Sequence, residues 1–259
     1  MISCLIWAIP LMAQDFEVAP VLVAFDANPG EIQTQNLTIR NHGNTEERFS
    51  LNLSDYTVRE DGTKESVEPG STDRSLADWI TINPSFVDLK PNEEATAELI
   101  MRVPRTGFNT RWGMVQVEVA KEQLPSDADK QLATGVVLVP RIVVLVKQSP
   151  RSNQNYSGRV SGLKEIQARG NAYRSFEAFL ENDGDKILDA KVFLALANME
   201  TAEEQVFKPK TVSVYPGQKL KVELSLAKKP EPGQFALAFL MDYGQRSAIE
   251  GAQMLLEVE

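Results

Sequence analysis

The sequence contains one cysteine, Cys4, and one histidine, His42, among 259 residues. A single thiol allows no disulfide within the chain and no thiolate metal cluster. His42 lies in a polar segment between Asn41 and Gly43; as a general base it would need a fixed partner and a pocket, whereas an exposed turn residue needs neither. The residues that usually carry catalysis are therefore scarce, and we expect no enzymatic activity and no cofactor.

Basic residues are fewer than acidic ones, with 27 Lys and Arg against 36 Asp and Glu. The formal net charge is -9, which argues against nucleic acid as a partner, because phosphate binding depends on clusters of Lys and Arg. No glycine-rich phosphate loop is present. No apolar run reaches the roughly 20 residues of a membrane-spanning helix. With 42% hydrophobic and 24% charged residues, the composition is that of a globular protein that does not span the membrane.

The N-terminal segment MISCLIWAIPLMA has no charged residue. An uncharged apolar segment that closes on a small residue is typical of a signal peptide, so residues 1–13 are predicted to be cleaved. Cleavage would remove Cys4 and leave no cysteine, which is natural for a bacterial periplasmic protein. We expect the protein in the periplasm or cell envelope of a Gram-negative bacterium.

Short segments of alternating apolar and polar residues, separated by turn formers, run along the whole chain. In residues 48–58, for example, Phe49, Leu51 and Leu53 share one face, as in a half-buried strand. The longest apolar strand is predicted in residues 132–147, LATGVVLVPRIVVLVK. Residues 59–75 are predicted to be a solvated loop, because they hold turn formers without an apolar period. The pattern predicts an all-β fold.

Two pairs of similar segments relate the halves of the chain. LTIRNHGN at residues 37–44 resembles AFLENDGD at residues 178–185, and residues 89–101 resemble residues 214–226. A polar linker, SPRSNQNYS, lies between the halves. We therefore predict two tandem immunoglobulin-like β-sandwich domains, residues 14–150 and residues 151–259.

Three further features have both a functional and a structural interpretation. Asp183 and Asp185 flank a glycine as in a calcium loop, but the next residues supply no side-chain oxygen, which favours a turn. The acidic tract of residues 55–78 is either a solvated loop or a docking surface for a basic partner. Trp79 and Trp112 lie in strand patterns, which favours core packing over a sugar-binding platform.

At residues 16–150 the sequence resembles the first domain of the PapD-like periplasmic pilus chaperones. The similar stretches are FEVAPVLVAFDANPGEIQTQNLTIRNHGN, DWITINPSFVDLKPNEEATAELIMRVP and RWGMVQVEV. The segment is also similar to the related domain of cell-surface proteins that interact with WxL-domain partners. The resemblance implies an immunoglobulin-like first domain whose last strand is donated to an incomplete pilus subunit.

On that resemblance, Thr134, Val136 and Leu138 are the positions that would contact the partner, and we extend the predicted site along the same strand to Arg141 and Val143. The arginine and lysine with which the family holds the subunit carboxylate are not matched; Val143 occupies the lysine position.

The sequence thus predicts a non-enzymatic, chaperone-like assembly factor. It would bind an extracytoplasmic protein, whether a pilus, secreted or surface protein, through an edge strand and a cleft between the domains. The alternative is a structural or adhesive module of the cell envelope that docks a surface protein or the cell wall, with the strand wholly buried. That alternative would use the acidic tract, and its binding would weaken with added salt.

Overall fold

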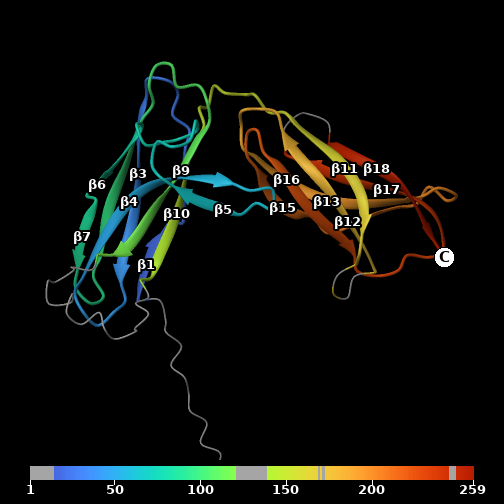
Figure 1. Ribbon diagram of the computed structural model, residues 1–259, viewed down its shortest axis with the longest axis horizontal. Helices are drawn as coiled ribbons and strands as arrows, with labels where there is room; N and C mark the ends of the chain where they lie inside the picture. Colours follow the sequence, from blue (N-terminus) through green and yellow to red (C-terminus); the bar gives the residue numbers. More distant parts are fainter. Residues whose placement is uncertain (1–14, 121–138, 169, 171–172, 245–248) are drawn as a thin grey trace, which may run out of the picture. The chain divides into compact units, whose positions relative to one another are not determined.

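The computed structural model describes residues 15–120, 139–168, 170, 173–244 and 249–259, which form eighteen β-strands. Contacts divide this part of the chain into two compact units. The first unit comprises residues up to Asp55, Glu68–Thr106 and, from Trp112, residues up to Gln148; the second comprises Tyr56–Val67, Gly107–Arg111 and Ser149–Glu259. In Figure 1 colours follow the sequence, so most strands of the first unit are blue to green and most strands of the second are yellow to red.

The first unit is a sandwich of two sheets. One sheet has the order β1-β3-β8-β6 and the other the order β2-β10-β9-β4-β5, with β7 also paired to β4. Strand β5 and the end of β4 continue this second sheet by pairing, although the division by contacts counts them with the second unit. The strands are β1 (Phe16–Ala19), β2 (Leu22–Phe25), β3 (Ile32–Asn41), β4 (Glu47–Val58), β5 (Lys64–Val67), β6 (Ile80–Asn83), β7 (Phe86–Leu89), β8 (Glu94–Arg102), β9 (Arg111–Val119) and β10 (Arg141–Gln148). Alternate residues of both sheets meet in one core, as in immunoglobulin-like sandwiches.

The second unit repeats this construction with a sheet of order β11-β12-β16 and a sheet of order β14-β13-β17-β18, to which β15 adds by pairing with β13. The strands are β11 (Gly158–Ile166), β12 (Arg174–Asn182), β13 (Leu188–Asn198), β14 (Glu204–Val206), β15 (Lys210–Val214), β16 (Lys219–Leu226), β17 (Gly233–Asp242) and β18 (Glu250–Val258). Its core lies between the two sheets and is separate from that of the first unit. The prediction of an all-β fold with two immunoglobulin-like sandwiches is confirmed; the domain boundaries and the cleavage site stay predictions.

Most predicted strands are present, and the predicted core face of β4 is buried at Phe49 and Leu51. Trp79 and Trp112 are buried as expected. No helix in the described residues is long and apolar enough to cross a membrane.

The predicted loop of residues 59–75 is corrected by the structure, because it contains strand β5. A tight turn forms a hairpin with the end of β4: the Arg59 backbone N–H donates to the Thr63 carbonyl at 2.9 Å. Gly62 has a φ of 85°, a left-handed conformation that glycine adopts without a steric cost. The sequence pattern missed the strand because neither face of KESV is apolar.

The outer face of the β11-β12-β16 sheet is a ladder of charges. On β12, Glu181 accepts hydrogen bonds from the Ser161 hydroxyl and Arg159 and lies 3.5 Å from the Lys219 ammonium. The hydrogen bond from Ser161, followed by that from Arg159, lowers the pKa of Glu181 to about 2. Glu177 makes a similar ion pair with Lys164 at 3.1 Å. This face therefore follows the usual pattern of an antiparallel sheet, with charged residues outward.

Candidate partner-binding site

Strand β10 is the described part of the long apolar strand predicted in residues 132–147. It lies between β9 and β2 in its sheet. Val144 and Val146 point into the core and are fully buried. Arg141 and Val143 have the opposite orientation, because successive side chains of a strand alternate between its faces, and 39% of Val143 is exposed. The strand is thus core on one face and an exposed surface on the other.

The strand pairing on one edge of β10 stops halfway along it. Strand β2 runs parallel to β10 and is in register with it only from Leu145, opposite Leu22, to Gln148. The chain segment before β2 belongs to the other sheet, where β1 pairs with β3. Pro20 lies between these strands, and proline lacks the N–H that a continuous ladder would need there.

Residues 141–144 of β10 consequently have an open edge within the described part of the chain. The Leu145 N–H donates to the Val21 carbonyl at 3.0 Å, so odd-numbered residues of β10 direct their backbone groups to this edge. The N–H and C=O of Val143 and Arg141 therefore point to the open edge, because backbone groups alternate sides along a strand. An open edge of this kind is a template for a strand of another chain.

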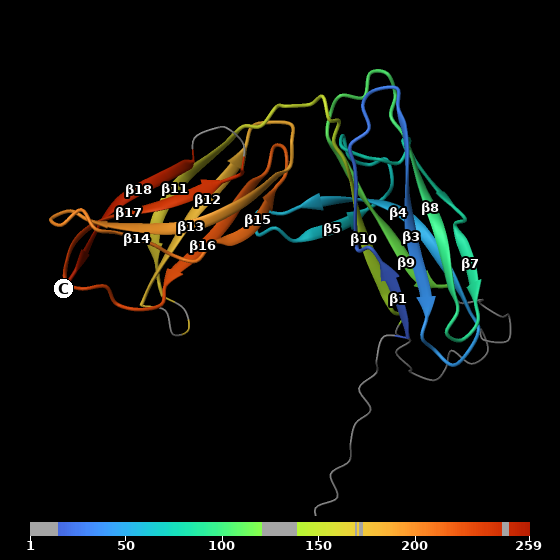
Figure 2. The ribbon, with the colours of Figure 1, turned by 180° about the vertical axis from the view of Figure 1, so that it is seen from behind.

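A groove of about 530 Å³ lies between β1 and β10, at the start of this open edge beside Arg141 and Ile142. β1 and β10 lie close together in Figure 1 and in the view from behind in Figure 2. The apolar residues of the groove are Phe16, Val18, Val21 and Ile142, and its polar residues are Glu17, His42 and Arg141. Its apolar lining suits side chains of an added strand.

Polar and charged side chains at the rim of the groove are arranged in pairs. The Arg141 Nε donates to Glu118 Oε2 at 2.9 Å. On the other side the His42 Nε2 lies 3.0 Å from Glu17 Oε2. Both pairs are exposed, so each contributes little to stability, on the order of 1 kcal/mol or less.

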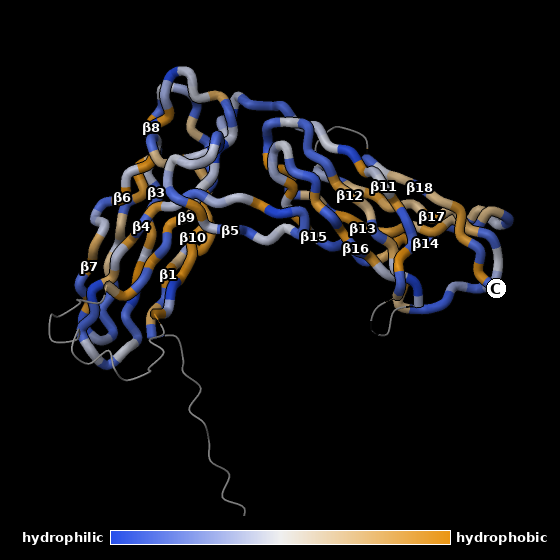
Figure 3. Tube along the Cα trace, in the orientation of Figure 1, coloured by the Kyte–Doolittle hydropathy of each residue, from blue (hydrophilic) through white to orange (hydrophobic). Residues whose placement is uncertain are grey.

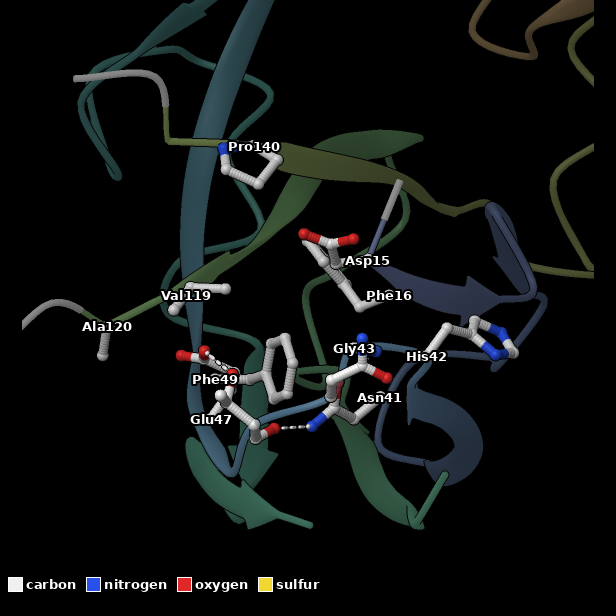
Figure 4. Close-up of a pocket in the computed structure, with 12 residues that line it drawn as sticks. Asp15, Phe16, Asn41, His42, Gly43, Glu47, Phe49, Val119, Ala120 and Pro140 are labelled. Atoms are coloured by element: carbon white, nitrogen blue, oxygen red, sulfur yellow. Dashed lines mark hydrogen bonds between the residues drawn. The ribbon is translucent and has the colours of Figure 1, made fainter. Parts of the chain in front are cut away.

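A second, larger cavity of about 620 Å³ opens at the same end of the first sandwich. In Figure 4 the ring of Phe49 lies between Val119 and Asn41, with Pro140 and Asp15 above it in the view. The rings of Phe49 and Phe16 are 5.0 Å apart between centroids and supply the apolar lining. This cavity extends the apolar surface beside the start of β10.

The predicted site residues divide into two groups. Thr134, Val136 and Leu138 lie outside the described residues. Arg141 and Val143 lie on the outward face of β10, and their backbone groups point to its open edge. Their role in binding stays a prediction.

The sequence analysis did not identify the opposite wall of the groove, which comes from β1. Its only trace in the sequence is the alternation of Phe16 and Val18 around Glu17. That pattern shows which face of the strand is buried, but it does not show which strand lies next to it.

Several carboxylates of the acidic tract are engaged in local contacts. Asp55 is fully buried, and its carboxylate accepts hydrogen bonds from the Ser75 hydroxyl at 2.7 Å and from the Thr72 hydroxyl and backbone N–H. The Arg59 guanidinium donates to Glu65 at 2.8 Å. These carboxylates order the tract itself.

The aspartates considered for calcium are also engaged. Asp183 lies 3.5 Å from Arg159, and Asp185 accepts hydrogen bonds from the Thr110 N–H and the Asn153 amide. Among the described residues, no group of three or more His, Cys, Asp or Glu could hold a metal ion. The segment therefore serves as a turn between β12 and β13.

Comparisons with solved structures find chains similar to this one. A chain of the chaperone–tip adhesin complex of CFA/I fimbriae matches with a TM-score of 0.52 and 10% identity, over 93% of this chain and 98% of that chain. The class 5 fimbriae chaperone CfaA matches over 93% of this chain and 98% of that chain, with 11% identity and a TM-score of 0.49.

A chain of the CsuC-CsuE pre-assembly complex of Csu pili from Acinetobacter baumannii matches over 80% of this chain and 89% of that chain, with 15% identity and a TM-score of 0.43. No protein-family model and no curated protein matches the sequence. At such low identity the likeness concerns the fold. The chain shares its fold of two immunoglobulin-like sandwiches with the chain of the CFA/I complex.

Proposed function

We propose that this protein is a non-enzymatic, chaperone-like assembly factor of the periplasm or cell envelope of a Gram-negative bacterium. It binds an extracytoplasmic protein, such as a pilus, secreted or surface protein, which adds a strand to β10. The observation that carries the proposal is the open edge of residues 141–144 beside an apolar groove. The PapD-like fold agrees with this role. The predicted contribution of a cleft between the domains stays a prediction.

The backbone geometry of β10 allows a sharp test. The Val143 N–H points to the open edge, whereas the N–H of Val144 points to β9. Replacing Val143 with proline removes one donor from the open edge and leaves the pairing with β9 intact, and edge strands tolerate proline. Val143→Ala is the matched control, because it shortens the same side chain and keeps the N–H.

The experiment captures partners from the native envelope fraction with the wild-type protein and with both variants. We expect a specific extracytoplasmic protein with the wild type and with Val143→Ala, and its loss with Val143→Pro. Equal capture by a folded Val143→Pro protein would contradict strand addition at this edge. Circular dichroism and thermal unfolding establish that the variants fold.

Backbone hydrogen exchange gives an independent readout on the same residues. In the free protein the Val143 amide should exchange quickly and the Val144 amide slowly. The purified partner should slow exchange at Val143. Slow exchange at both amides in the free protein would instead favour a structural module with this strand wholly buried. Capture that weakens steeply with added salt would favour that alternative too, because backbone pairing depends little on charge.

A further inference from the structure

The second unit has two outer faces of opposite character. The outer face of β11-β12-β16 carries the ladder of charges described above, which includes Glu177, Glu181 and Lys219. The outer face of the other sheet, at the centre of β13 and β17, carries no charge at all. Both strands have their core positions at alternate residues, such as Leu194 and Leu237, so the residues between them point outward.

These outward residues form what we call the apolar face. It consists of the outward side chains within residues 193–197 of β13 and 236–240 of β17, bordered by Val206 of β14 and Leu255 of β18. The exposed Gln253 of β18, opposite Ala238, is the polar residue at this border. Both borders are well exposed, with 58% of Val206 and 72% of Leu255 accessible. Figure 3 shows the hydrophobic colouring of these strands. An antiparallel sheet exposed to water normally alternates with polar residues, and a contiguous apolar patch marks an interaction site.

The apolar face has a relief set by the strand register. Ala195 lies opposite Ala238, and Ala197 lies opposite Ala236, which makes a shallow trough of small side chains. At one end of this trough Phe193 and Leu240 form a ridge. Gly251 makes room for Leu240, since a Cβ at this glycine would come within 2.6 Å of the Leu240 Cδ2.

We propose that the apolar face is a self-association surface, on which a second copy of this chain packs face to face. The two copies are related by a two-fold axis that lies between the sheets and runs across the strands. This operation places the ridge of Phe193 and Leu240 over the alanine trough of the other copy. One surface then supplies both the projecting and the receiving shape, as a two-fold interface requires.

The charges at the ends of the apolar face fit the same operation. Lys191 points outward on β13 beyond Phe193, opposite Asp242 of β17, and Glu204 lies on β14 opposite Ala197, at the other end. Both side chains are exposed, and neither forms an ion pair with another described residue. The two-fold operation exchanges the ends of the strands, so Lys191 of each copy meets Glu204 of the other. Complementary charges at a rim fix the register of two surfaces.

The size of the apolar face predicts a weak dimer. Four strands about 4.8 Å apart and six residues along each give a patch of roughly 400 Å² per copy. Stable complexes bury about 800 Å² per partner. We therefore expect a dissociation constant of roughly 10 to 100 µM, a range in which local concentration decides the oligomeric state.

The test is sedimentation velocity of the full chain over a concentration series that brackets this range. Ala238→Arg places a long charged side chain in the trough, and we expect it to be monomeric throughout. Ala24→Arg is the matched control, because Ala24 is exposed on a sheet face of the first unit. It should associate like the wild type. Each reading is made on protein whose folding is verified by circular dichroism.

Charge reversal tests how the two copies are aligned, and it leaves the apolar residues of the interface unchanged. Lys191→Glu should weaken association about tenfold, because two exposed ion pairs become repulsive. The double variant Lys191→Glu with Glu204→Lys should restore it. A wild type that stays monomeric, a dimer that Ala238→Arg leaves unchanged, or a double variant no better than the single one would overturn the proposal. Partner capture through β10 is measured on the other unit and is judged separately.

Discussion

Asn41 and Asn182 make the same hydrogen bonds, one in each unit. The Asn41 Nδ2 donates to the Leu89 carbonyl at 2.9 Å and to the Thr45 carbonyl at 2.8 Å. The Asn182 Nδ2 donates to the Val214 and Lys186 carbonyls, both at 2.8 Å. Both asparagines are 1% exposed.

The equivalence extends to the backbone of the turns that face them. The Asn41 carbonyl accepts from Asn92 N–H and the Asn182 carbonyl accepts from Gly217 N–H, both at 2.9 Å. Asn92 and Gly217 both have left-handed backbones, with φ of 63° and 75°. The two pairs of similar segments in the sequence are therefore structurally equivalent corners of two related sandwiches.

Replacing either asparagine with alanine should destabilise its own unit by about 1 to 3 kcal/mol, because two buried carbonyls lose their donor. Urea unfolding of Asn41→Ala, Asn182→Ala and the double variant measures this, with the exposed Asn36→Ala as the control. The two losses should add, since the sites share no partner. A double variant as stable as either single one would contradict this independence, and clearly unequal single losses would contradict the equivalence.

The glycines that follow these asparagines should differ in tolerance. A Cβ on Gly184 would lie 2.6 Å from the Asn155 carbonyl oxygen and 2.7 Å from the Ser157 nitrogen, whereas one on Gly43 would be no closer than 3.0 Å to the side-chain oxygen of Asn41. Gly184→Ala should therefore lower the urea midpoint clearly, and Gly43→Ala much less. Equal effects of the two substitutions would show that the backbone around Gly184 moves to accommodate the added Cβ.

Acid should remove the contribution of Glu181 to stability. Its pKa falls from an ordinary value of 4.5 to about 2 on folding, so the contribution is complete above pH 4.5 and is lost as the pH falls towards 2. The free energies of unfolding of the wild type and Glu181→Gln should differ most at neutral pH and converge over this range. Urea unfolding at a series of pH values measures the difference in the free energy of unfolding. A difference that does not change with pH would show that it does not come from the lowered pKa of Glu181.

The buried carboxylate of Asp55 should be worth about 2 to 3 kcal/mol to the first unit. Asp55→Ala leaves the Ser75 hydroxyl and the Thr72 N–H without this acceptor, and hydrogen bonds to a charged group contribute the most. The exposed Asp73→Ala is the control, since it removes a carboxylate from the same loop. Guanidinium unfolding of both variants measures the loss, and equal stability of the two would contradict the role of Asp55.

The sequence by itself determined the fold class and the repeated corners. Alternation in segments such as FSLNL and turn residues at short intervals are local properties, and each depends only on neighbouring residues. The Asn-x-Gly corners could be matched between the halves because each corner forms within a few residues of its asparagine.

Only the tertiary structure decided which edges and faces are open. The segment FEVAPVLVAF is apolar apart from Glu17, but its halves pair with different sheets, and the open edge beside Val143 follows from that division. β13 and β17, with VFLALA and FALAFL, are apolar on both faces, so their period cannot tell the core face from the outer one. Long-range pairing makes that choice, because it determines which face the opposite sheet covers.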